Sequence, residues 1–457
     1  MIAPAPASPG APSLALPRSF WKDFTRKHWD REPVLFQGLF GGQGPSLQDI
    51  FEALVEATER TLKGELPPHR GIRFFIEHED GPNGLPYYSI LFAPSQAHLP
   101  SREDRDAHAY VERITRVLGG KRFGLVLNRT QTQHWRHWQQ LHGFLASVHE
   151  SSSMPLRSSD SAVFFGNYRY TPFGIHKDDL HIFYFVVEGT KRLSLWPFEA
   201  LSQREELPRD PGLRQRNGII TLRDKADEER VLAQATVLEG RAGDLMYWPV
   251  SHWHRAEPTQ GLSVSASLGL AVTPPEFISM APPGEWPESV RPNEMPAGKG
   301  WRMPAALRTA LRRQSRRQEM TALERERTTE WVRFLTGGTL EGAAPVAREA
   351  PLQPQEWIRA TARRPIVSVP LPGGGLLVSA NGHAQALAPA PTAHRRLEQL
   401  LETLNGGKPQ QVEQLEQAFF HRMTGRGFSR NALRLLLDEL VRWRGVERCE
   451  PPSSRRR

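Results

Sequence analysis

The stretch GIHKD, residues 174–178, decides the fold and the chemistry that this sequence predicts. Its two metal-binding side chains, His176 and Asp178, stand at positions i and i+2. On a β-strand, side chains at that spacing point to the same face. One strand can therefore present both to a single ion, while Lys177 points the other way.

A partner for this pair stands far downstream, in the stretch GDLMYWPVSHWH at residues 243–254. His254 ends that stretch, and it can join the pair only if a distant strand folds back beside the first. Two imidazoles and one carboxylate cap one face of a metal ion and leave the other face open, which is the ligand set of non-haem Fe(II) oxygenases. His252 is a rival third ligand, because it would share the face of His254 on an extended segment.

The residues around these two stretches predict the strands of a β-barrel. The run IFYFVV is β-branched and aromatic, as expected of a buried strand. Turn residues separate the apolar runs, with EGT after the first and EGRAGD before the third. The predicted strands are residues 182–187, 191–196, 245–248 and 262–268.

The motifs in this region resemble the core of the JmjC-type cupin oxygenases. The residues that carry the resemblance are HKDDLHIF at 176–183, GTKR at 189–192, and GD, YWP and WH within 243–254. The sequence is most similar to the ribosomal oxygenase (cupin-4) group of 2-oxoglutarate-dependent protein hydroxylases, over about residues 160–272. The resemblance implies an α+β protein with a double-stranded β-helix (jelly-roll) core. It also implies Fe(II) as the metal, with 2-oxoglutarate and O2 as co-substrates.

The same resemblance assigns roles to individual residues. It makes His176, Asp178 and His254 the iron ligands and the catalytic residues. Lys191 matches the basic residue that pairs with the distal carboxylate of 2-oxoglutarate, a role that suits a compact cation with three donors. The other residues predicted to bind the co-substrate are Asn167, Tyr168 and Ser267.

Two residues near the first motif depart from the family pattern. His181 stands where ribosomal oxygenases tend to carry an acidic residue, and Ile182 stands where a related asparaginyl hydroxylase has an amide. We expect His181 to shape the pocket, because a fourth protein ligand would occupy a position that oxygen or 2-oxoglutarate needs. Tyr170 and Tyr247 are expected in the same pocket. The histidines of a helix predicted over residues 134–148 are expected to pack or to lie on the surface.

Composition bounds the compartment and the partners. The single cysteine, Cys449, excludes an internal disulfide and fits a reducing cytosol. No apolar run approaches the ~20 residues of a transmembrane helix, so a cytoplasmic protein with no membrane contact is predicted. The net charge of +9 favours an acidic or phosphate-rich partner such as RNA, and solubility alone is the competing explanation.

Changes in composition along the chain divide it into several predicted parts. A leader rich in Pro, Ala and Ser is expected to be disordered. An arginine-rich helical region follows the barrel, and a homodimer formed through it is one hypothesis. The predicted boundaries are 1–16 for the leader, 17–150 for an N-terminal α/β part, 151–273 for the metal-binding barrel, 274–345 for the helical region, 365–448 for a winged-helix-like domain and 449–457 for a basic tail.

Three local signals carry the winged-helix prediction. An Asn-Gly pair at 381–382 predicts a hairpin, and a Gly-Gly pair at 406–407 ends a helix. Ser429 is expected to cap the third helix. That helix offers only Arg430 and Arg434 as early basic groups, which favours packing or peptide binding over the reading of bases.

The sequence therefore predicts an enzyme that hydroxylates a side chain of a polypeptide, ribosomal or other, while 2-oxoglutarate is converted to succinate. One alternative is the same chemistry on a peptide natural product or a tRNA base. Another is a metal-binding cupin that is not an oxygenase. Asp178 argues against the His-x-His cupins, and Lys191 argues against a pure scaffold, which has no use for a buried cation.

Overall fold

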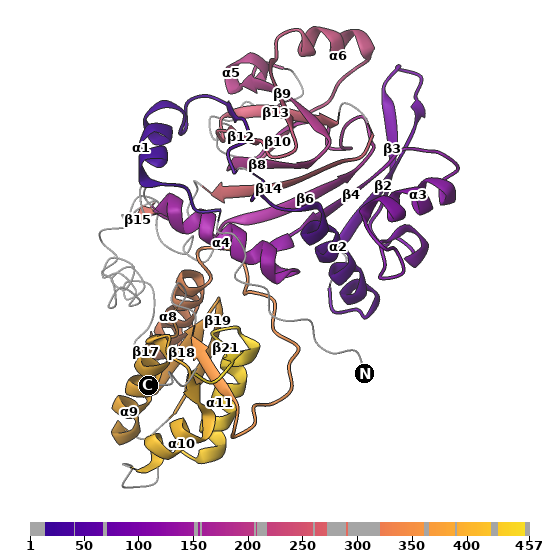
Figure 1. The fold of residues 1–457 in the computed structure, drawn as a ribbon. Coiled ribbons are helices and arrows are strands. Elements are labelled where there is room, and N and C mark those ends of the chain that lie inside the picture. The colour runs from indigo at the N-terminus through magenta and orange to yellow at the C-terminus, as the bar shows by residue number, and fades with distance from the viewer. Residues whose placement is uncertain are drawn as a thin grey trace. The chain divides into compact units, whose positions relative to one another are not determined.

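The computed structural model divides the chain into two compact units, Met1–Pro275 and Glu276–Arg457 (Figure 1). The predicted leader lies mostly outside the described residues. Its last three residues are ordered, contrary to prediction, because Leu14 is fully buried and the Leu16 N–H donates to Ser147 Oγ at 3.2 Å. The described residues are 14–40, 42–66, 71–149, 154–155, 158–204, 207, 217–258, 261–271, 289–290, 320–360, 365–388, 391–421 and 428–452.

The first unit combines helices with a large set of strands. Its α-helices are α1 Arg18–Lys27, α2 Leu47–Leu62, α3 Ala107–Val117, α4 Trp135–His149, α5 Phe198–Leu201 and α6 Lys225–Leu232, and its 3-10 helices are η2 Gln96–His98 and η3 Thr130–Thr132. Its strands are β1 Val34–Phe36, β2 Ile72–Asp80, β3 Pro86–Leu91, β4 Phe123–Asn128, β5 Met154–Pro155, β6 Asp160–Gly166, β7 Ile175–Lys177, β8 Leu180–Glu188, β9 Thr190–Pro197, β10 Gly218–Ile220, β11 Thr236–Arg241, β12 Leu245–Trp248, β13 His252–Pro258 and β14 Ser263–Ala271.

Two antiparallel sheets form the core of this unit. The larger sheet has the order β1-β12-β8-β14-β6-β4-β2-β3, and the smaller has the order β10-β7-β13-β9-β11. Strands that are distant in sequence are neighbours in both sheets, as a double-stranded β-helix requires. The four strands predicted between residues 182 and 268 correspond to β8, β9, β12 and β14, so that part of the prediction is confirmed.

The turn from β8 to β9 shows how local sequence sets this topology. Gly189 has φ +71°, a conformation that residues with a side chain rarely adopt. A Cβ there would also collide with the backbone oxygen of Leu262. The glycine therefore lets the chain leave the larger sheet and enter the smaller one in a single tight turn.

Apolar side chains fill the space between the two sheets. Tyr184 and Met246 point inward from the larger sheet, where they meet Leu193 and Leu195 from the smaller one. The odd-numbered residues of β8 point the other way, toward the helices. Phe183 there packs within 5.9 Å of Trp21 in α1 and 5.1 Å of Phe144 in α4, measured between ring centroids. The larger sheet thus has one face toward the smaller sheet and one face beneath helices.

The N-terminal helices begin where their capping residues predict. Ser46 accepts a hydrogen bond from Asp49 N at the start of α2. Asp106 does the same for Ala109 N at the start of α3. These caps satisfy amide groups that the helices themselves leave unpaired.

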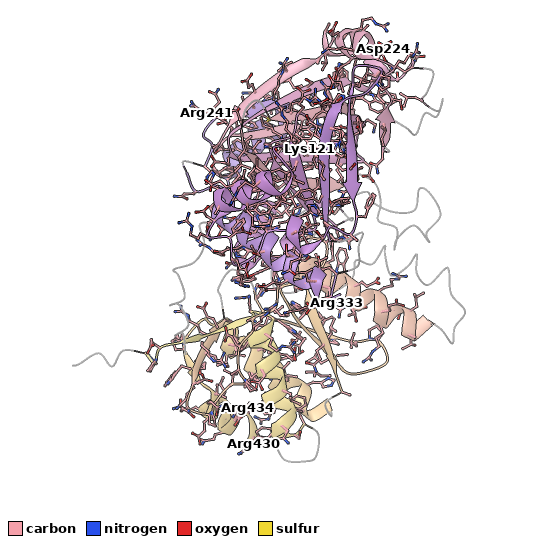
Figure 2. The ribbon with its side chains drawn as sticks, turned by 90° about the vertical axis from the view of Figure 1, so that its right-hand side faces the viewer. Lys121, Asp224, Arg241, Arg333, Arg430 and Arg434 are labelled. Carbon is pink, nitrogen blue, oxygen red and sulfur yellow. The ribbon has the colours of Figure 1, made fainter. Side chains whose placement is uncertain are left out.

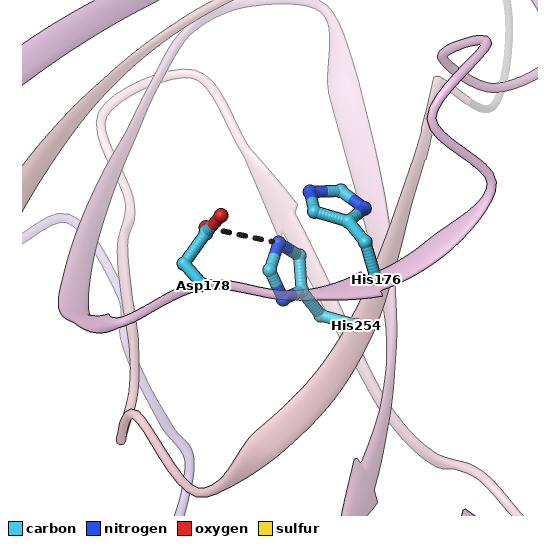
Figure 3. A group of neighbouring side chains, drawn as sticks. All are labelled: His176, Asp178 and His254. Atoms are coloured by element: carbon cyan, nitrogen blue, oxygen red, sulfur yellow. Dashed lines mark ion pairs between the residues drawn. The ribbon is translucent and has the colours of Figure 1, made fainter. Parts of the chain in front are cut away.

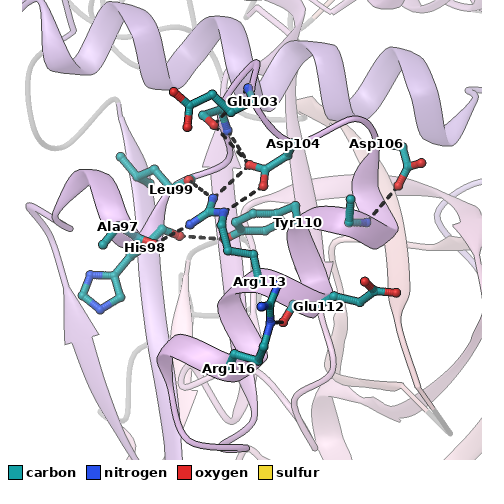
Figure 4. A network of polar contacts seen from close by, with 12 residues as sticks. Ala97, His98, Leu99, Glu103, Asp104, Asp106, Tyr110, Glu112, Arg113 and Arg116 are labelled. Carbon is teal, nitrogen blue, oxygen red and sulfur yellow. Dashed lines mark hydrogen bonds and ion pairs between the residues drawn. The ribbon is translucent and has the colours of Figure 1, made fainter.

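A polar network ties the loop before α3 to that helix (Figure 4). The Arg113 guanidinium donates to both Asp104 carboxylate oxygens, at 2.8 and 2.9 Å, and to the carbonyls of Ala97 and Leu99. Tyr110 donates to the His98 carbonyl at 2.7 Å. Burial opposes the ionisation of Asp104, yet hydrogen bonds from Arg113 and Ser101 hold the pKa of Asp104 below its usual value.

The histidines of α4 pack, as predicted. His137 is fully buried, and neither ring nitrogen has a hydrogen-bond partner among the described residues. His134 lies near two carboxylates, with its Nε2 at 3.2 Å from Glu52 Oε2. The second carboxylate, Asp49, already pairs with Arg136 at 3.5 Å. The cluster of Asp49, Glu52 and His134 therefore already has a counter-ion in Arg136.

In the described residues of the second unit there are two three-stranded sheets, β20-β16-β21 and β17-β18-β19, and four helices. Within the arginine-rich region expected after the barrel, the arginines between residues 308 and 317 lie outside the described residues. The elements described are β15 Ser289–Val290, α8 Met320–Thr336, β16 Trp357–Ala360, β17 Val367–Pro370, β18 Leu376–Ala380, β19 His383–Leu387, α9 Pro391–Asn405, β20 Gln410–Gln411, α10 Val412–His421, α11 Arg430–Arg442 and β21 Val446–Cys449.

Three local predictions for this unit are confirmed. Residues 381–382 turn between β18 and β19, α9 ends just before the glycine pair at 406–407, and Ser429 accepts from Ala432 N at the start of α11. Helix α11 carries Arg430 and Arg434, which are labelled in Figure 2. Arg434 pairs with Glu416 at 2.7 Å, and Arg430 lies over the ring of Phe420. Both arginines make internal contacts, which agrees with packing; the winged-helix assignment stays a prediction.

No helix in the described ranges is both long enough and apolar enough to cross a membrane.

Candidate metal centre

The two halves of the predicted ligand set meet where β7 lies beside β13. The strands are antiparallel, and His176 is directly opposite His254 in the register. Asp178 follows one residue after β7 ends. One donor atom from each of the three residues falls within a group in which all atoms lie within 4.8 Å of one another (Figure 3). The fold therefore brings together the three side chains singled out in the sequence.

The internal geometry of the cluster suits a metal ion. The two imidazole centroids are 4.2 Å apart, and His254 Nε2 lies 3.6 Å from Asp178 Oδ2. His176 Nδ1 lies 3.1 Å from the Gly174 carbonyl, which can accept a hydrogen bond but not donate one. Nδ1 must then carry the proton, so Nε2 keeps the lone pair that binds a metal.

Burial sets the charge of these groups. The pKa of His254 is held well below its usual value, first by burial and then by the neighbouring His176. Burial also raises the pKa of Asp178, against the pull of His176. A neutral imidazole is the form that binds metals, and a divalent cation would favour the ionised carboxylate. The donor set therefore fits a divalent ion, which would supply the positive charge that the site lacks.

Lys191 provides a buried cation on the same face of the smaller sheet. It is fully buried on β9 and shares strand parity with Leu195, which is opposite His254. Its Nζ donates to the Tyr168 hydroxyl at 2.9 Å and lies 4.7 Å from the centre of that ring. Burial lowers the pKa of Lys191 to about 7, although the charge of Glu257 opposes the shift. An anionic group bound beside Lys191 and Tyr168 would relieve this electrostatic cost.

The remaining predicted co-substrate residues have other contacts. Asn167 Oδ1 accepts a hydrogen bond from Phe123 N at 2.9 Å, so its amide oxygen joins β4 to the segment after β6. Ser267 lies opposite Tyr184 in the register, which places it on the inner face of the larger sheet. Its Oγ lies 3.4 Å from the Ala162 carbonyl. Ser267 therefore faces the space between the sheets, whereas the amide oxygen of Asn167 is bound to a backbone N–H.

The pocket role expected for Tyr247 and His181 is wrong. Both have the strand parity of Phe183, so they point to the helix-covered face of the larger sheet. Tyr247 Oη lies 3.1 Å from His181 Nδ1 and accepts from Asp30 N at 3.0 Å, and Trp29 packs on the His181 ring. The alternation of side chains along β8 and β12 is the reason. These residues join α1 to the sheet.

The outcome for the rival ligand and for Tyr170 follows from their contacts. His252 lies opposite Pro197, with Nδ1 at 3.4 Å from Ser251 Oγ, and it is not part of the three-residue group. Tyr170 lies beneath the guanidinium of Arg255, at 4.5 Å from the ring centre. The geometry favours His254 as the third ligand.

Two features of the site were not anticipated from the sequence. Trp248 packs against the His254 ring, with centroids 4.8 Å apart. Ser265 donates to the Tyr184 hydroxyl inside the barrel. The alternation of serines along residues 262–268 was a signal for an inward polar row, but it did not name Tyr184 as the partner.

Comparison with known proteins finds one family that matches the part of the chain holding this site. Residues 96–268 match the family described as a cupin-like domain. No curated protein sequence matches the chain. The X-ray structure of Escherichia coli ycfD is 16% identical, with 94% of this chain and 98% of that chain covered and a TM-score of 0.46. The structure of YcfD, a ribosomal oxygenase from the same organism, with cobalt and 2-oxoglutarate, is 15% identical with the same coverage and a TM-score of 0.44.

The overlap with those two structures is too loose to add to the argument, so the family match and the two facing sheets carry the conclusion. The matched range contains the whole cluster of His176, Asp178 and His254, all of the smaller sheet, and strands β4, β6, β8 and β12 of the larger sheet. The predicted cupin core is thereby confirmed. Residues 96–268 of this chain match the cupin-like domain, and the candidate metal centre lies inside the matched range.

Proposed function

We propose that this protein is an Fe(II)- and 2-oxoglutarate-dependent oxygenase that hydroxylates a side chain of a polypeptide. The observation that carries the proposal is the pairing of a two-histidine, one-carboxylate cluster with a fully buried lysine on the same face of one sheet. A structural metal site would have no need of the lysine. A co-substrate with a distant carboxylate needs both.

In this proposal, His176, Asp178 and His254 hold Fe(II) from one side. When bound, the iron and 2-oxoglutarate would supply oxygen activation coupled to decarboxylation. The hydrogen bond between His176 and Gly174 O holds one imidazole in the binding tautomer. Trp248 supports the ring of His254 and covers it. The chain thus contributes placement of the ligands and exclusion of water.

Lys191 and Tyr168 are proposed to hold the far carboxylate of 2-oxoglutarate. The ammonium would form a charge-assisted pair, and the Tyr168 hydroxyl, already within 2.9 Å of Nζ, would donate a second hydrogen bond. Burial raises the pKa of Tyr168 well above its usual value, so its hydroxyl keeps the proton that it would donate. Ser267 lies on the same inner surface, as a third polar group.

The polypeptide substrate follows from the resemblance of the motifs to protein hydroxylases, and a ribosomal protein is the first candidate. The net charge of +9 suits an approach to a ribosomal particle or to RNA. The same centre acting on a peptide natural product or a tRNA base would give the same co-substrate chemistry with a different product. Screening ribosomal proteins, free peptides and tRNA for a mass gain of one oxygen separates these outcomes.

The co-substrate proposal is tested by anaerobic reconstitution of the full chain with Fe(II) and 2-oxoglutarate. We expect a weak visible charge-transfer band in the wild type and none in His176→Ala. Lys191→Ala should keep the band but need at least about tenfold more 2-oxoglutarate, because it loses a charge-assisted hydrogen bond. Lys121→Ala removes an exposed lysine and serves as the matched control.

The absence of a band in metal-loaded wild type would contradict the proposal and leave a metal-binding cupin of another kind. An unchanged affinity in Lys191→Ala would contradict the role given to that lysine alone.

A further inference from the structure

Arg73 is a half-buried cation that lacks a carboxylate partner among the described residues. It lies on β2. A guanidinium has five N–H donors, and among the described residues those of Arg73 make one hydrogen bond, from Nη2 to Asn128 Oδ1 at 3.2 Å. Burial lowers the pKa of Arg73, and no acidic group opposes that shift. Of the three acids on its strand, Glu77 and Asp80 are paired with Arg169 at 2.6 and 2.8 Å, and Glu79 is exposed at the far end of the strand.

Other arginines of this unit behave differently. Arg113 pairs with Asp104, and Arg255 pairs with Glu228 at 2.6 Å. Both are partly or fully buried, yet the pKa of each is raised. For Arg113 the main cause is its hydrogen bond to Asp104. For Arg255, burial lowers the pKa, but Glu257 and Glu228 raise it by more. Desolvating a guanidinium without a partner costs free energy, which structural arginines avoid in this way. The exception at Arg73 therefore calls for an anion from outside the chain.

The register places Arg73 on the face of the larger sheet that looks toward the metal centre. Arg73 is opposite Val126, Val126 is opposite Phe164, and Phe164 is opposite Ser265. Directly opposed residues share a face, so this row continues the inner face that carries Tyr184. Arg73 and the proposed metal ligands therefore look into the same space.

That part of the inner face is open to solvent. Along β6, the inward residues Ala162 and Phe164 are partly exposed, whereas the residues that point to the helices are buried. Ser267 and Asn128, in the row beside them, are also partly exposed. We call the residues Arg73, Asn128, Ala162, Phe164, Phe173 and Ser267 the open inner face.

Phe173 connects this surface to the metal centre. Its ring lies 4.9 Å from the Arg73 guanidinium carbon and 5.9 Å from the His176 ring. The guanidinium is therefore within about 11 Å of that ring. An extended peptide advances about 3.3 Å per residue, so this reach corresponds to roughly three residues.

We infer that Arg73, supported by Asn128, binds a carboxylate of the polypeptide substrate on the open inner face. The inference rests on the proposed function, because the metal centre defines where the reacting residue lies. The carboxylate would belong to an Asp or Glu side chain, or to a chain terminus, within roughly three residues of the hydroxylated position. Arg73 would then be a specificity residue, since it holds the substrate and does not touch the reacting atoms.

The test is a binding selection with the full chain, without iron or turnover. Randomised hexapeptides with free and with amidated carboxyl termini are incubated with immobilised protein, and the retained peptides are sequenced. We expect enrichment of Asp or Glu if the side chain is the source, or of free over amidated termini if the terminus is. Arg73→Gln should lower the enrichment about tenfold, and Arg73→Glu should replace it with enrichment of Lys and Arg.

Arg122→Gln is the matched control, since Arg122 is more than half exposed and lies 4.0 Å from Glu77. It should keep the wild-type pattern, and circular dichroism verifies that each variant is folded. Wild type without carboxylate enrichment in either arm, or Arg73→Gln with undiminished enrichment, would overturn the inference. Because the selection involves no oxygen chemistry, its result is independent of the charge-transfer experiment.

Discussion

At the scale of single residues, the most consequential group is a lysine that is buried away from water. Lys191 is fully buried beside Tyr168, and burial lowers its pKa to about 7. A buried cation costs free energy in the ligand-free protein, and a bound anion would offset that cost. In the proposed function, the same lysine is already in place to bind the far carboxylate of 2-oxoglutarate.

The burial of Lys191 predicts that the stability of the protein depends on pH. Because the folded-state pKa of Lys191 lies below the unfolded value of 10.5, the unfolded chain binds more protons between about pH 7 and 10.5. The penalty is therefore full below pH 7 and shrinks as pH rises. Lys191→Met should be more stable than wild type near pH 7, with a gap that narrows by pH 9. Thermal unfolding of the ligand-free proteins across this range measures the gap, and a gap that is constant with pH would refute the assignment.

The same reasoning applies to His137, whose pKa burial lowers to about 3, with a smaller effect of His134. Between pH 6.5 and 3, His137 is protonated in the unfolded chain but not in the folded one, so the protein becomes less stable as the pH is lowered. His137→Leu should lose less stability than wild type from pH 6.5 to 4. His108→Leu, at an exposed position of α3, is the control and should follow wild type. Acid titrations of tryptophan fluorescence would show the difference.

At the scale of elements, one arginine joins a loop to a helix. Arg113 pairs with a carboxylate that is almost fully buried and also satisfies two backbone carbonyls (Figure 4). Arg113→Ala should destabilise the first unit by about 2 to 3 kcal/mol, because Asp104 would be left without its partner. Arg116→Ala, on the same helix and exposed, should have little effect. Urea unfolding compares the two, and equal effects would argue against the network.

Strands show a similar division of labour. β7 is three residues long, and the pairing of His176 with His254 depends on β13 lying beside it. The i and i+2 spacing of His176 and Asp178 is a local property of an extended backbone. The third candidate ligand, His254, reaches them only through strand pairing between distant parts of the chain.

At the scale of the whole molecule, the chain forms two compact units, and the cupin-like domain lies in the first. The homodimer hypothesis concerns residues 300–340, of which only those from 320 onward are described. Sedimentation velocity at micromolar concentration tests it. A dimer would sediment at about twice the monomer mass of 51.7 kDa, and a monomer would remove the hypothesis.

The sequence by itself determined the candidate ligand pair, the buried lysine, the strand runs and the turns and caps. These features are local, because the pleat of a strand, the φ of a glycine and the reach of a capping serine depend on a few neighbouring residues. Only the tertiary structure decided that Tyr247 and His181 face the helices and that Arg73 faces the metal centre. Which face of a strand is buried, and against what, depends on register and packing between segments far apart in the chain.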